Sequence, residues 1–437
     1  MKTILMAGGR GTRIAELFPN IPKPLIPVDG MPILEREIRS LASQGFKDLI
    51  LTVGYLADKI IDYFGDGSKL GVRIDYFVEE TPLGNAGALF RLNDKIGYEP
   101  FLLLNADAAF DVDFNRMVEY HKQHGGLVTL FTHPNSHPYD SGLIIADKDG
   151  NVSKWLSKED ERPVWYSNRV NAGLHVIDPK VLELSLENLE IDAETGFPKG
   201  KVDLDRQILK PLCGTGKMFC YDSPEYVKDM GTPERFHQVE ADYRNGVVQA
   251  KNLHNKQKAV FLDRDGTINK YVGFLRNIDD FELIEGVSEA IKQINQSGYL
   301  AIVVTNQPVI ARGEVTWDEL HEIHKKMETL LGKEGAYIDG MYICPHHPDK
   351  GFEGERPEYK FDCDCRKPKP GLLLQAAKDF NIDLSQSYMI GDSERDVEAG
   401  KAAGCKDSIL VETNKENALL KVCEDIIRMS KCQGIDA

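Results

Sequence analysis

The 437-residue sequence lacks features that mark several classes of protein. No apolar run approaches membrane-spanning length, and there is no internal repeat or low-complexity tract. Positive charge is in deficit, with 53 lysines and arginines against 69 acidic residues. This balance excludes bulk attraction to nucleic acid or to an anionic membrane. The apolar start breaks at Gly8 and Gly9, so no signal-peptide core forms, and we expect a cytoplasmic protein.

The eight cysteines do not form an evenly spaced disulfide framework. Clustered cysteines in a cytosolic protein are more often metal ligands than disulfides. Apolar residues make up 42% and charged residues 28% of the chain, which is typical of a soluble globular protein. The length is sufficient for two ordinary domains, each with its own core.

Strands and helices alternate along the first half of the sequence. We expect a helix over residues 32–44 and strands over residues 3–7, 48–53, 73–78 and 101–105. Such alternation predicts an α/β fold with a parallel, doubly wound sheet, in which ligands bind at the carboxyl ends of the strands.

The alternation restarts after a polar stretch. A helix is expected from Glu234 to about Val247, and a new apolar strand begins at Ala259. We therefore predict two doubly wound, Rossmann-like domains in tandem, residues 1–247 and 259–437, joined by a linker at 248–258.

A glycine-rich turn follows the first predicted strand. Its residues include Gly8, Gly9, Gly11 and Thr12. Backbone N–H groups in such a turn can approach phosphate oxygens closely, and nearby cations add charge, namely Arg10, Arg13 and Lys23. Glycines alone would equally fit a plain tight turn.

The surrounding pattern resembles the sugar-1-phosphate nucleotidyltransferases. The motifs occur in that family's order over roughly the first 240 residues: Gly8 to Arg13, Lys23-Pro24-Leu25, Glu79 to Leu89, Asn105-Ala106-Asp107, Asn171-Ala172-Gly173 and Val227 to Pro233. The resemblance implies attack of a sugar-phosphate oxygen on the α-phosphorus of a nucleotide, with release of pyrophosphate. Catalysis would then be positioning and charge neutralisation.

The family's functional residues can be carried over position by position. Asp107 and Asp229 match the carboxylates that hold Mg²⁺, and Arg13 and Lys23 match the cations around the triphosphate. The expected sugar contacts are Lys158, Asn171 and Gly142. Two positions depart from the family pattern: Ala106 replaces a glycine, and Glu159 follows Lys158 where the family has proline.

The nucleotide base is expected to be read near Glu79, Glu80 and Gly84. A carboxylate can accept hydrogen bonds from guanine N1–H and N2–H₂, which adenine does not offer. This pattern favours guanine, and a solvated acidic pair at a strand end is the alternative.

Two carboxylates, Asp263 and Asp265, follow the first strand of the second domain. One can attack phosphorus while the other moves protons. A calcium loop could also begin this way, but the rest of that pattern is missing.

The second half resembles the haloacid dehalogenase phosphatases over about residues 259–425. The motifs are Asp263 to Thr267, Val304 to Gln307, Arg366 to Pro370 and Ile390 to Asp396. The resemblance implies Asp263 as nucleophile through an aspartyl-phosphate and Asp265 as acid and base. It assigns Thr305 and Lys367 to the phosphoryl group, with Asn306 and Arg366 at the substrate. Mg²⁺ would be bound by Asp263, Asp392 and the backbone carbonyl of Asp265. Asp396 fits either a role beside the metal, which we favour, or a helix N-terminal acid.

A cysteine–histidine cluster lies between these motifs. Three thiols and one imidazole suit tetrahedral Zn²⁺: Cys344, His346, Cys363 and Cys365. His347 is the competing ligand. The set leaves no open position, so we expect a structural zinc that anchors the loop delivering Arg366 and Lys367.

This zinc loop resembles that of the D-glycero-D-manno-heptose-1,7-bisphosphate 7-phosphatases, and histidinol-phosphate phosphatases carry a similar one.

The combined pattern predicts a bifunctional enzyme that removes the 7-phosphate of heptose 1,7-bisphosphate and then transfers GMP from GTP to heptose 1-phosphate. Its partners would be small molecules, and oligomeric state is left open. Two alternatives remain: a mannose- or glucose-1-phosphate nucleotidyltransferase fused to a histidinol-phosphate-like or broad-range phosphatase, and a non-catalytic sugar-nucleotide sensor in the first half.

Overall fold

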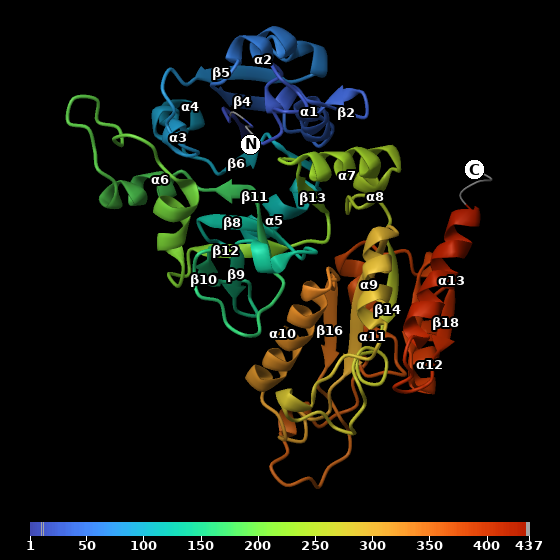
Figure 1. Cartoon of the computed structure of the whole chain (residues 1–437). Coiled ribbons are helices and arrows are strands. Elements are labelled where there is room, and N and C mark those ends of the chain that lie inside the picture. Colours follow the sequence, from blue (N-terminus) through green and yellow to red (C-terminus); the bar gives the residue numbers. More distant parts are fainter. Residues whose placement is uncertain (10, 12, 434–437) are drawn as a thin grey trace. The chain divides into compact units, whose positions relative to one another are not determined.

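The computed structural model describes residues 1–9, 11 and 13–433 (Figure 1). The chain forms two compact units that do not follow one another simply along the sequence. The first contains residues 1–133, 144–156 and 171–252, and the second contains residues 134–143, 157–170 and 253–437. Each unit is built around its own sheet.

The main sheet of the first unit has its strands in the order β10-β9-β11-β6-β1-β4-β5, with β8 and β12 attached beside β11. Their bounds are β1 (Lys2–Ala7), β4 (Asp48–Val53), β5 (Arg73–Val78), β6 (Phe101–Asn105), β8 (Val128–His133), β9 (Leu143–Ala146), β10 (Val152–Leu156), β11 (Val170–Ile177) and β12 (Met218–Asp222). The four predicted strands β1, β4, β5 and β6 are parallel, as expected. The sheet as a whole is mixed, because β11 runs antiparallel to β6.

Two short ribbons and several helices complete this unit. The ribbons are β2 (Pro27–Val28) with β3 (Met31–Pro32), and β7 (Ala108–Asp111) with β13 (Tyr226–Asp229). The helices are α1 (Ile33–Ser43), α2 (Ala57–Phe64), α3 (Gly87–Arg91), α4 (Asn93–Ile96), α5 (Phe114–His124), α6 (Lys180–Ser185), α7 (Pro233–Arg244) and α8 (Val247–Ala250). The predicted helices at 32–44 and 234–247 correspond to α1 and α7.

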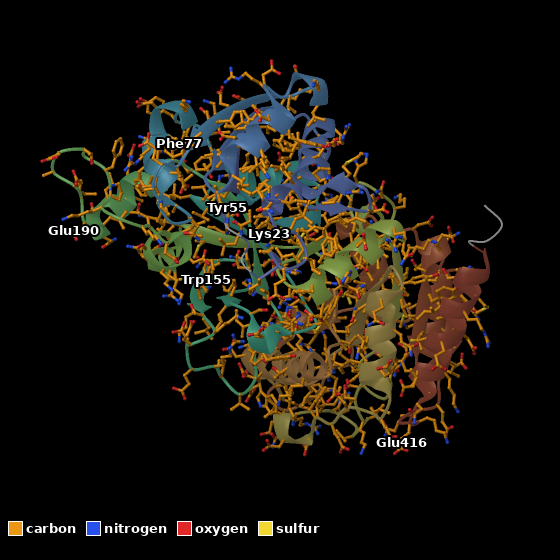
Figure 2. The ribbon with its side chains drawn as sticks, turned by 45° about the horizontal axis from the view of Figure 1, so that its top comes forward. Lys23, Tyr55, Phe77, Trp155, Glu190 and Glu416 are labelled. Atoms are coloured by element: carbon orange, nitrogen blue, oxygen red, sulfur yellow. The ribbon has the colours of Figure 1, made fainter. Side chains whose placement is uncertain are left out.

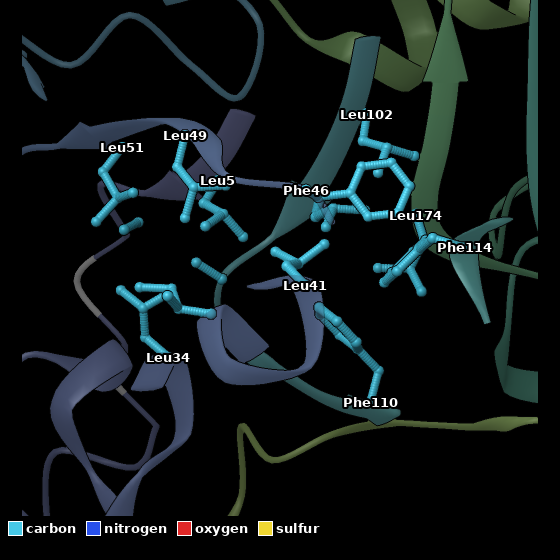
Figure 3. Close-up of a cluster of buried hydrophobic side chains, with 14 of the residues drawn as sticks. Leu5, Leu34, Leu41, Phe46, Leu49, Leu51, Leu102, Phe110, Phe114 and Leu174 are labelled. Carbon is cyan, nitrogen blue, oxygen red and sulfur yellow. The ribbon is translucent and has the colours of Figure 1, made fainter. Parts of the chain in front are cut away.

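The core of the first unit lies on both faces of the sheet. Leu5 of β1 packs with Leu34 and Leu41 of α1 (Figure 3), whereas its neighbour Ile4 packs on the opposite face with α3 and α4 residues such as Leu89. Successive strand residues point to opposite faces, so a strand that is apolar throughout must be covered on both sides. This explains why the predicted strands read as continuous apolar runs.

The second unit contains a parallel sheet in the order β16-β15-β14-β17-β18. The strands are β14 (Lys258–Leu262), β15 (Tyr299–Asn306), β16 (Gly340–Cys344), β17 (Tyr388–Gly391) and β18 (Asp407–Leu410). The helices are α9 (Val287–Gln296), α10 (Trp317–Lys333), α11 (Gly371–Asp379), α12 (Glu394–Ala403) and α13 (Ala418–Gln433). Val260 and Leu262 of β14 pack with α9, α10 and α13, while Phe261 packs with α11 and α12. The α/β class and the doubly wound arrangement are thereby confirmed.

Helix α10 also contacts the two short segments that join the second unit. The hydroxyl of Thr329 accepts a hydrogen bond from the backbone N–H of Tyr166 at 2.9 Å. The ring of Trp165 lies 5.5 Å from Lys326 Nζ and 5.6 Å from Lys333 Nζ. Trp165 and Tyr166 therefore pack against this helix. Within the described part of the chain, no helix is both long and apolar enough to cross a membrane.

Candidate active sites

The first candidate site is a cleft of about 900 Å³ at the carboxyl ends of β1, β4 and β6. Seven of the predicted residues line it: Gly8, Gly9, Lys23, Glu79, Glu80, Gly84 and Asp107. Lys23 and Tyr55, which both line the cleft, are labelled in Figure 2. The position follows from the parallel strands, whose carboxyl ends meet along one edge.

The glycine turn brings backbone close to the cleft wall. A Cβ at Gly8 would lie 3.6 Å from Glu79 Oε1, and Gly11 has a φ of +57°, which glycine adopts without strain. A Cβ at Gly11 would lie 3.1 Å from Lys23 Cβ. Thr12, predicted to bind phosphate, lies outside the described residues.

Lys23 connects the two predicted Mg²⁺ carboxylates. Its Nζ lies 3.0 Å from Asp107 Oδ2 and 3.1 Å from Asp229 Oδ1. Asp107 follows β6, and the pairing of β13 with β7 places Asp229 opposite Ala108. Two carboxylates that converge on one cation form a donor set that also fits Mg²⁺.

Basic side chains control the ionisation of Asp229. Arg235 Nη1 donates to Asp229 Oδ2 at 2.9 Å. Burial opposes ionisation of Asp229, but Lys23 and Arg235 outweigh it and hold its pKa below the ordinary value. A Cβ at Gly231 would lie 3.0 Å from Asp229 Oδ1 and 3.2 Å from Arg13 Nη2, so the Arg13 guanidinium lies beside this carboxylate.

The two predicted base-reading carboxylates differ in their surroundings. Glu79 is half-buried, and its Oε2 accepts a hydrogen bond from the backbone N–H of Leu83 at 3.1 Å. Burial raises the pKa of Glu79. Glu80 is exposed. Of the pair, Glu79 has the more fixed geometry.

The predicted sugar contacts are divided between the two units. Asn171 lies near the cleft. Its Oδ1 accepts a hydrogen bond from the N–H of Gly173 at 3.4 Å, and a Cβ at Gly173 would lie 2.2 Å from Nδ2 of Asn105, which lines the cleft. Gly142 and Lys158 belong to the segments of the second unit, where Lys158 Nζ pairs with Asp140 at 2.8 Å.

The second candidate site lies at the carboxyl ends of β14, β15 and β17. Asp263 follows β14, Thr305 and Asn306 end β15, and Asp392 follows β17. A Cβ at Gly266 would lie 2.1 Å from Asp392 Oδ2, so only glycine permits the close approach of these two loops. Carboxylate oxygens of Asp263, Asp392 and Asp396 lie within 4.8 Å of one another, a donor set that fits Mg²⁺.

Lys367 is a buried cation of this site. Its Nζ lies 2.7 Å from Asp263 Oδ1 and 2.7 Å from Asp396 Oδ1. The backbone carbonyl and N–H of Lys367 bond to the Asn306 amide at 3.0 and 3.1 Å, which fixes the loop. Burial raises the pKa of Asp263 to about 7, although Lys367 opposes this shift. Asp396 has two roles, because it also completes the capping box with Ser393 at the start of α12.

Asp265 is held by three neighbouring side chains. Arg264 donates to both of its oxygens, Asn269 Nδ2 donates to Oδ1 at 3.0 Å, and Gln307 Nε2 donates to Oδ2 at 2.8 Å. Burial raises the pKa of Asp265, but these donors outweigh it and the net pKa is below the ordinary value. Gln307 Nε2 also lies 2.9 Å from Thr305 Oγ1.

The cysteine–histidine cluster forms one compact group. The Sγ–Sγ distances are 3.5 Å for Cys344–Cys363, 3.1 Å for Cys363–Cys365 and 3.2 Å for Cys365–Cys344. His346 Nδ1 lies 3.3 Å from Cys365 Sγ, whereas His347 Nδ1 accepts from the N–H of Asp349 at 3.2 Å. Three thiols and one imidazole at these separations fit a tetrahedral zinc site. Arg366 Nη1 donates to the carbonyl of His346 at 3.2 Å.

Sequence reasoning missed several residues of these sites. Lys201 lines the first cleft, and Arg235 contacts Asp229. Arg264 and His324 lie behind Asp265. Arg264 stands between the two predicted catalytic carboxylates, Asp263 and Asp265, in the sequence, so its position was a usable signal. The others are brought in by packing between distant segments.

Comparison with known proteins defines the class of the first part of the chain. The Nucleotidyl transferase family model matches residues 2–246, more than half of the chain. The chain therefore belongs to the nucleotidyl transferase family. One similar solved structure is that of HddC from Yersinia pseudotuberculosis complexed with GMP-PN. The match covers 55% of this chain and 99% of the HddC chain, with 23% identity and a TM-score of 0.46.

The remainder belongs to a phosphatase family. A HAD-hydrolase-like model matches residues 364–425. The D-glycero-beta-D-manno-heptose-1,7-bisphosphate 7-phosphatase of Pasteurella multocida (strain Pm70) is 48% identical over 160 residues, which is 36% of this chain and 84% of that protein. The phosphatase of the same name from Escherichia coli (strain K12) is 43% identical over 157 residues, which is 36% of this chain and 80% of that protein. The chain thus joins a nucleotidyltransferase domain to a HAD phosphatase domain of this family.

Proposed function

We propose that the chain catalyses two consecutive steps on one sugar. The phosphatase domain removes the 7-phosphate of D-glycero-D-manno-heptose 1,7-bisphosphate, and the nucleotidyltransferase domain transfers GMP from GTP to the resulting 1-phosphate. The observation that carries this proposal is the 48% identity to a heptose-bisphosphate phosphatase in a chain that also holds a nucleotidyltransferase domain. We assign the two activities to residues 1–247 and 259–437, in a cytoplasmic enzyme.

In the phosphatase step, Asp263 attacks phosphorus and Asp265 protonates the leaving oxygen. Asp265 then takes a proton from the water that hydrolyses the aspartyl-phosphate. Lys367, 2.7 Å from Asp263, and Thr305 neutralise the phosphoryl oxygens. Asp263, Asp392 and the Asp265 carbonyl would hold Mg²⁺, which lets an anionic nucleophile approach an anionic phosphate. Asn306 and Arg366 face the rest of the substrate.

In the transferase step, the protein positions two anions and offsets their charge. The turn of Gly8, Gly9, Gly11 and Thr12 cradles the triphosphate, and Arg13 and Lys23 contact its oxygens. Asp107 and Asp229 would hold Mg²⁺, which withdraws charge from the α-phosphate. Gly142, Lys158 and Asn171 contact the sugar phosphate.

Guanine is the proposed base because Glu79 offers a half-buried carboxylate at the cleft wall. Its Oε2 already accepts from Leu83, and its Oε1 lies toward the glycine turn. Two such oxygens can accept from guanine N1–H and N2–H₂. Glu80 and Gly84 complete this part of the cleft.

Zinc is proposed as a structural clamp of the phosphatase domain. Cys344, His346, Cys363 and Cys365 use all four positions of a tetrahedral ion, so no place remains for substrate. Cys365 is two residues before Lys367, so the clamp would fix the loop that delivers the lysine.

The test uses the full chain with heptose 1,7-bisphosphate and each of the four NTPs in turn. We expect phosphate release with every NTP, and GDP-heptose with GTP alone, identified by mass. Phosphate release followed by a different nucleotide sugar would refute the guanine assignment. No phosphate release from the bisphosphate would refute the sugar assignment.

A further inference from the structure

Arg264, which separates the two catalytic carboxylates in sequence, is fully buried at 0% exposure. Its Nε and Nη2 donate to Asp265 Oδ1 at 3.1 and 2.8 Å, and Nη2 also lies 2.9 Å from Oδ2. The guanidinium therefore donates hydrogen bonds to both oxygens of the Asp265 carboxylate. Asp265 itself remains 21% exposed, so its outer edge still reaches solvent.

The remaining end of the guanidinium contacts His324 on α10. Arg264 Nη1 lies 2.9 Å from His324 Nε2, and both side chains are buried. Arginine has no acceptor, so Nη1 must donate and the imidazole Nε2 must accept. Burial and the neighbouring guanidinium hold the pKa of His324 well below its ordinary value, which agrees with a neutral acceptor.

We propose that Arg264 and His324 are a positioning pair that fixes the carboxylate of Asp265 for proton transfer, with α10 as the support. This inference rests on the proposed function, which assigns Asp265 as acid and base. His324 touches no reacting atom and acts through Arg264. Without an acceptor at position 324, Nη1 is left buried and unpaired, and the guanidinium shifts or admits water. Asp265 then loses its fixed orientation.

The proposal predicts a selective defect. Release of p-nitrophenolate from p-nitrophenyl phosphate needs no proton from Asp265, whereas hydrolysis of the aspartyl-phosphate needs a base. His324→Leu removes the acceptor. We expect the rate of its first turnover to stay within about threefold of that of the unaltered protein. Its steady-state rate should fall about 100-fold, which is within the usual range for general acid–base catalysis. A burst of nitrophenolate should therefore appear in stopped-flow traces. A purely structural lesion would slow both phases alike.

Three variants serve as controls. His324→Gln offers an amide oxygen as acceptor and should restore steady-state turnover. His321→Leu, one turn earlier on α10 and exposed, should behave as the unaltered protein. Asp265→Asn should show the burst in its strongest form. If His324→Leu does not fold, His324→Asn, which is too short to reach Nη1, takes its place.

The outcomes distinguish a failure of the positioning role from a failure of the proposed function. If Asp265→Asn gives the burst and His324→Leu and His324→Asn do not, the positioning role is wrong and the proposed function stands. If His324→Gln is as defective as His324→Leu, the acceptor is not what matters and the proposal is again wrong. If Asp265→Asn slows both phases alike, the assignment of Asp265 fails, and the inference with it.

Discussion

At Lys23, the carboxylate of Asp107, in the turn after β6, and that of Asp229, at the end of β13, meet one ammonium group. Asp107→Asn or Asp229→Asn keeps the shape and removes one anionic ligand of the proposed Mg²⁺ site. We expect pyrophosphate release to fall by about a hundredfold or more, comparable to the loss of a key electrostatic contact in other enzymes. Phosphatase activity should be unchanged.

The matched control is Asp94→Asn, an exposed aspartate of α4. It should retain both activities. Near-normal transferase rates in either Asp107→Asn or Asp229→Asn would show that the metal assignment is wrong.

Asp263 makes Mg²⁺ binding dependent on pH. Burial raises the pKa of Asp263 to about 7, so in the metal-free protein this carboxyl is protonated below pH 7 and ionised above it. A metal needs the ionised form, and protons therefore compete with it on the acid side. Calorimetric titration with Mg²⁺ should give about tenfold weaker binding to the phosphatase site at pH 6 than at pH 8.

Asp263→Asn removes the competing proton. The remaining, weaker Mg²⁺ binding of this variant should vary little between pH 6 and pH 8. An equally steep pH dependence in the variant would mean that another group controls the affinity.

At the scale of elements, the cysteine–histidine cluster joins the end of β16 to the loop before α11. Cys363→Ser removes one thiolate, and we expect loss of zinc and of phosphatase activity together, because structural zinc contributes directly to local folding. Elemental analysis and phosphate release measure the two losses, and pyrophosphate release should persist.

Cys405→Ser is the control for this substitution. Cys405 is a partly buried free thiol outside the cluster. The variant should keep its zinc and both activities. Purified, active protein without zinc would contradict the site.

The sequence predicted those parts of the sites that depend on strands. Asp263 and Asp392 follow β14 and β17, which are neighbours in a parallel sheet, so their approach follows from strand order. The contact between Arg264 and His324 depends instead on how α10 packs, and nothing in the local sequence specifies that. The pairing of Lys158 with Asp140 likewise depends on how two separate segments pack, so the motif that contains Lys158 did not predict it.

At the scale of the whole molecule, two activities in one chain can be tested by complementation. Asp263→Asn protein should make no GDP-heptose from heptose 1,7-bisphosphate and GTP, since the 7-phosphate stays in place. Asp107→Asn protein should stop at heptose 1-phosphate. A mixture of the two variants should produce GDP-heptose, because one supplies the intermediate that the other consumes.

Mass analysis of the three reactions distinguishes these outcomes. An inactive mixture, with each variant retaining its own single activity on supplied substrates, would show that the intermediate does not pass between molecules. GDP-heptose from Asp263→Asn protein alone would contradict the role of Asp263.

The bridge between Lys23, Asp107 and Asp229 also bears on the order in which ligands arrive. Lys23 is only 5% exposed, and its ammonium depends on these two carboxylates for counter-charge. A bare divalent ion that captured the carboxylates would leave a buried ammonium unpaired, which is strongly unfavourable. An ion that enters already complexed with a triphosphate brings the replacement anion with it. The metal and the nucleotide are therefore expected to load as a single complex, and the lysine exchanges carboxylate for phosphate in the same event.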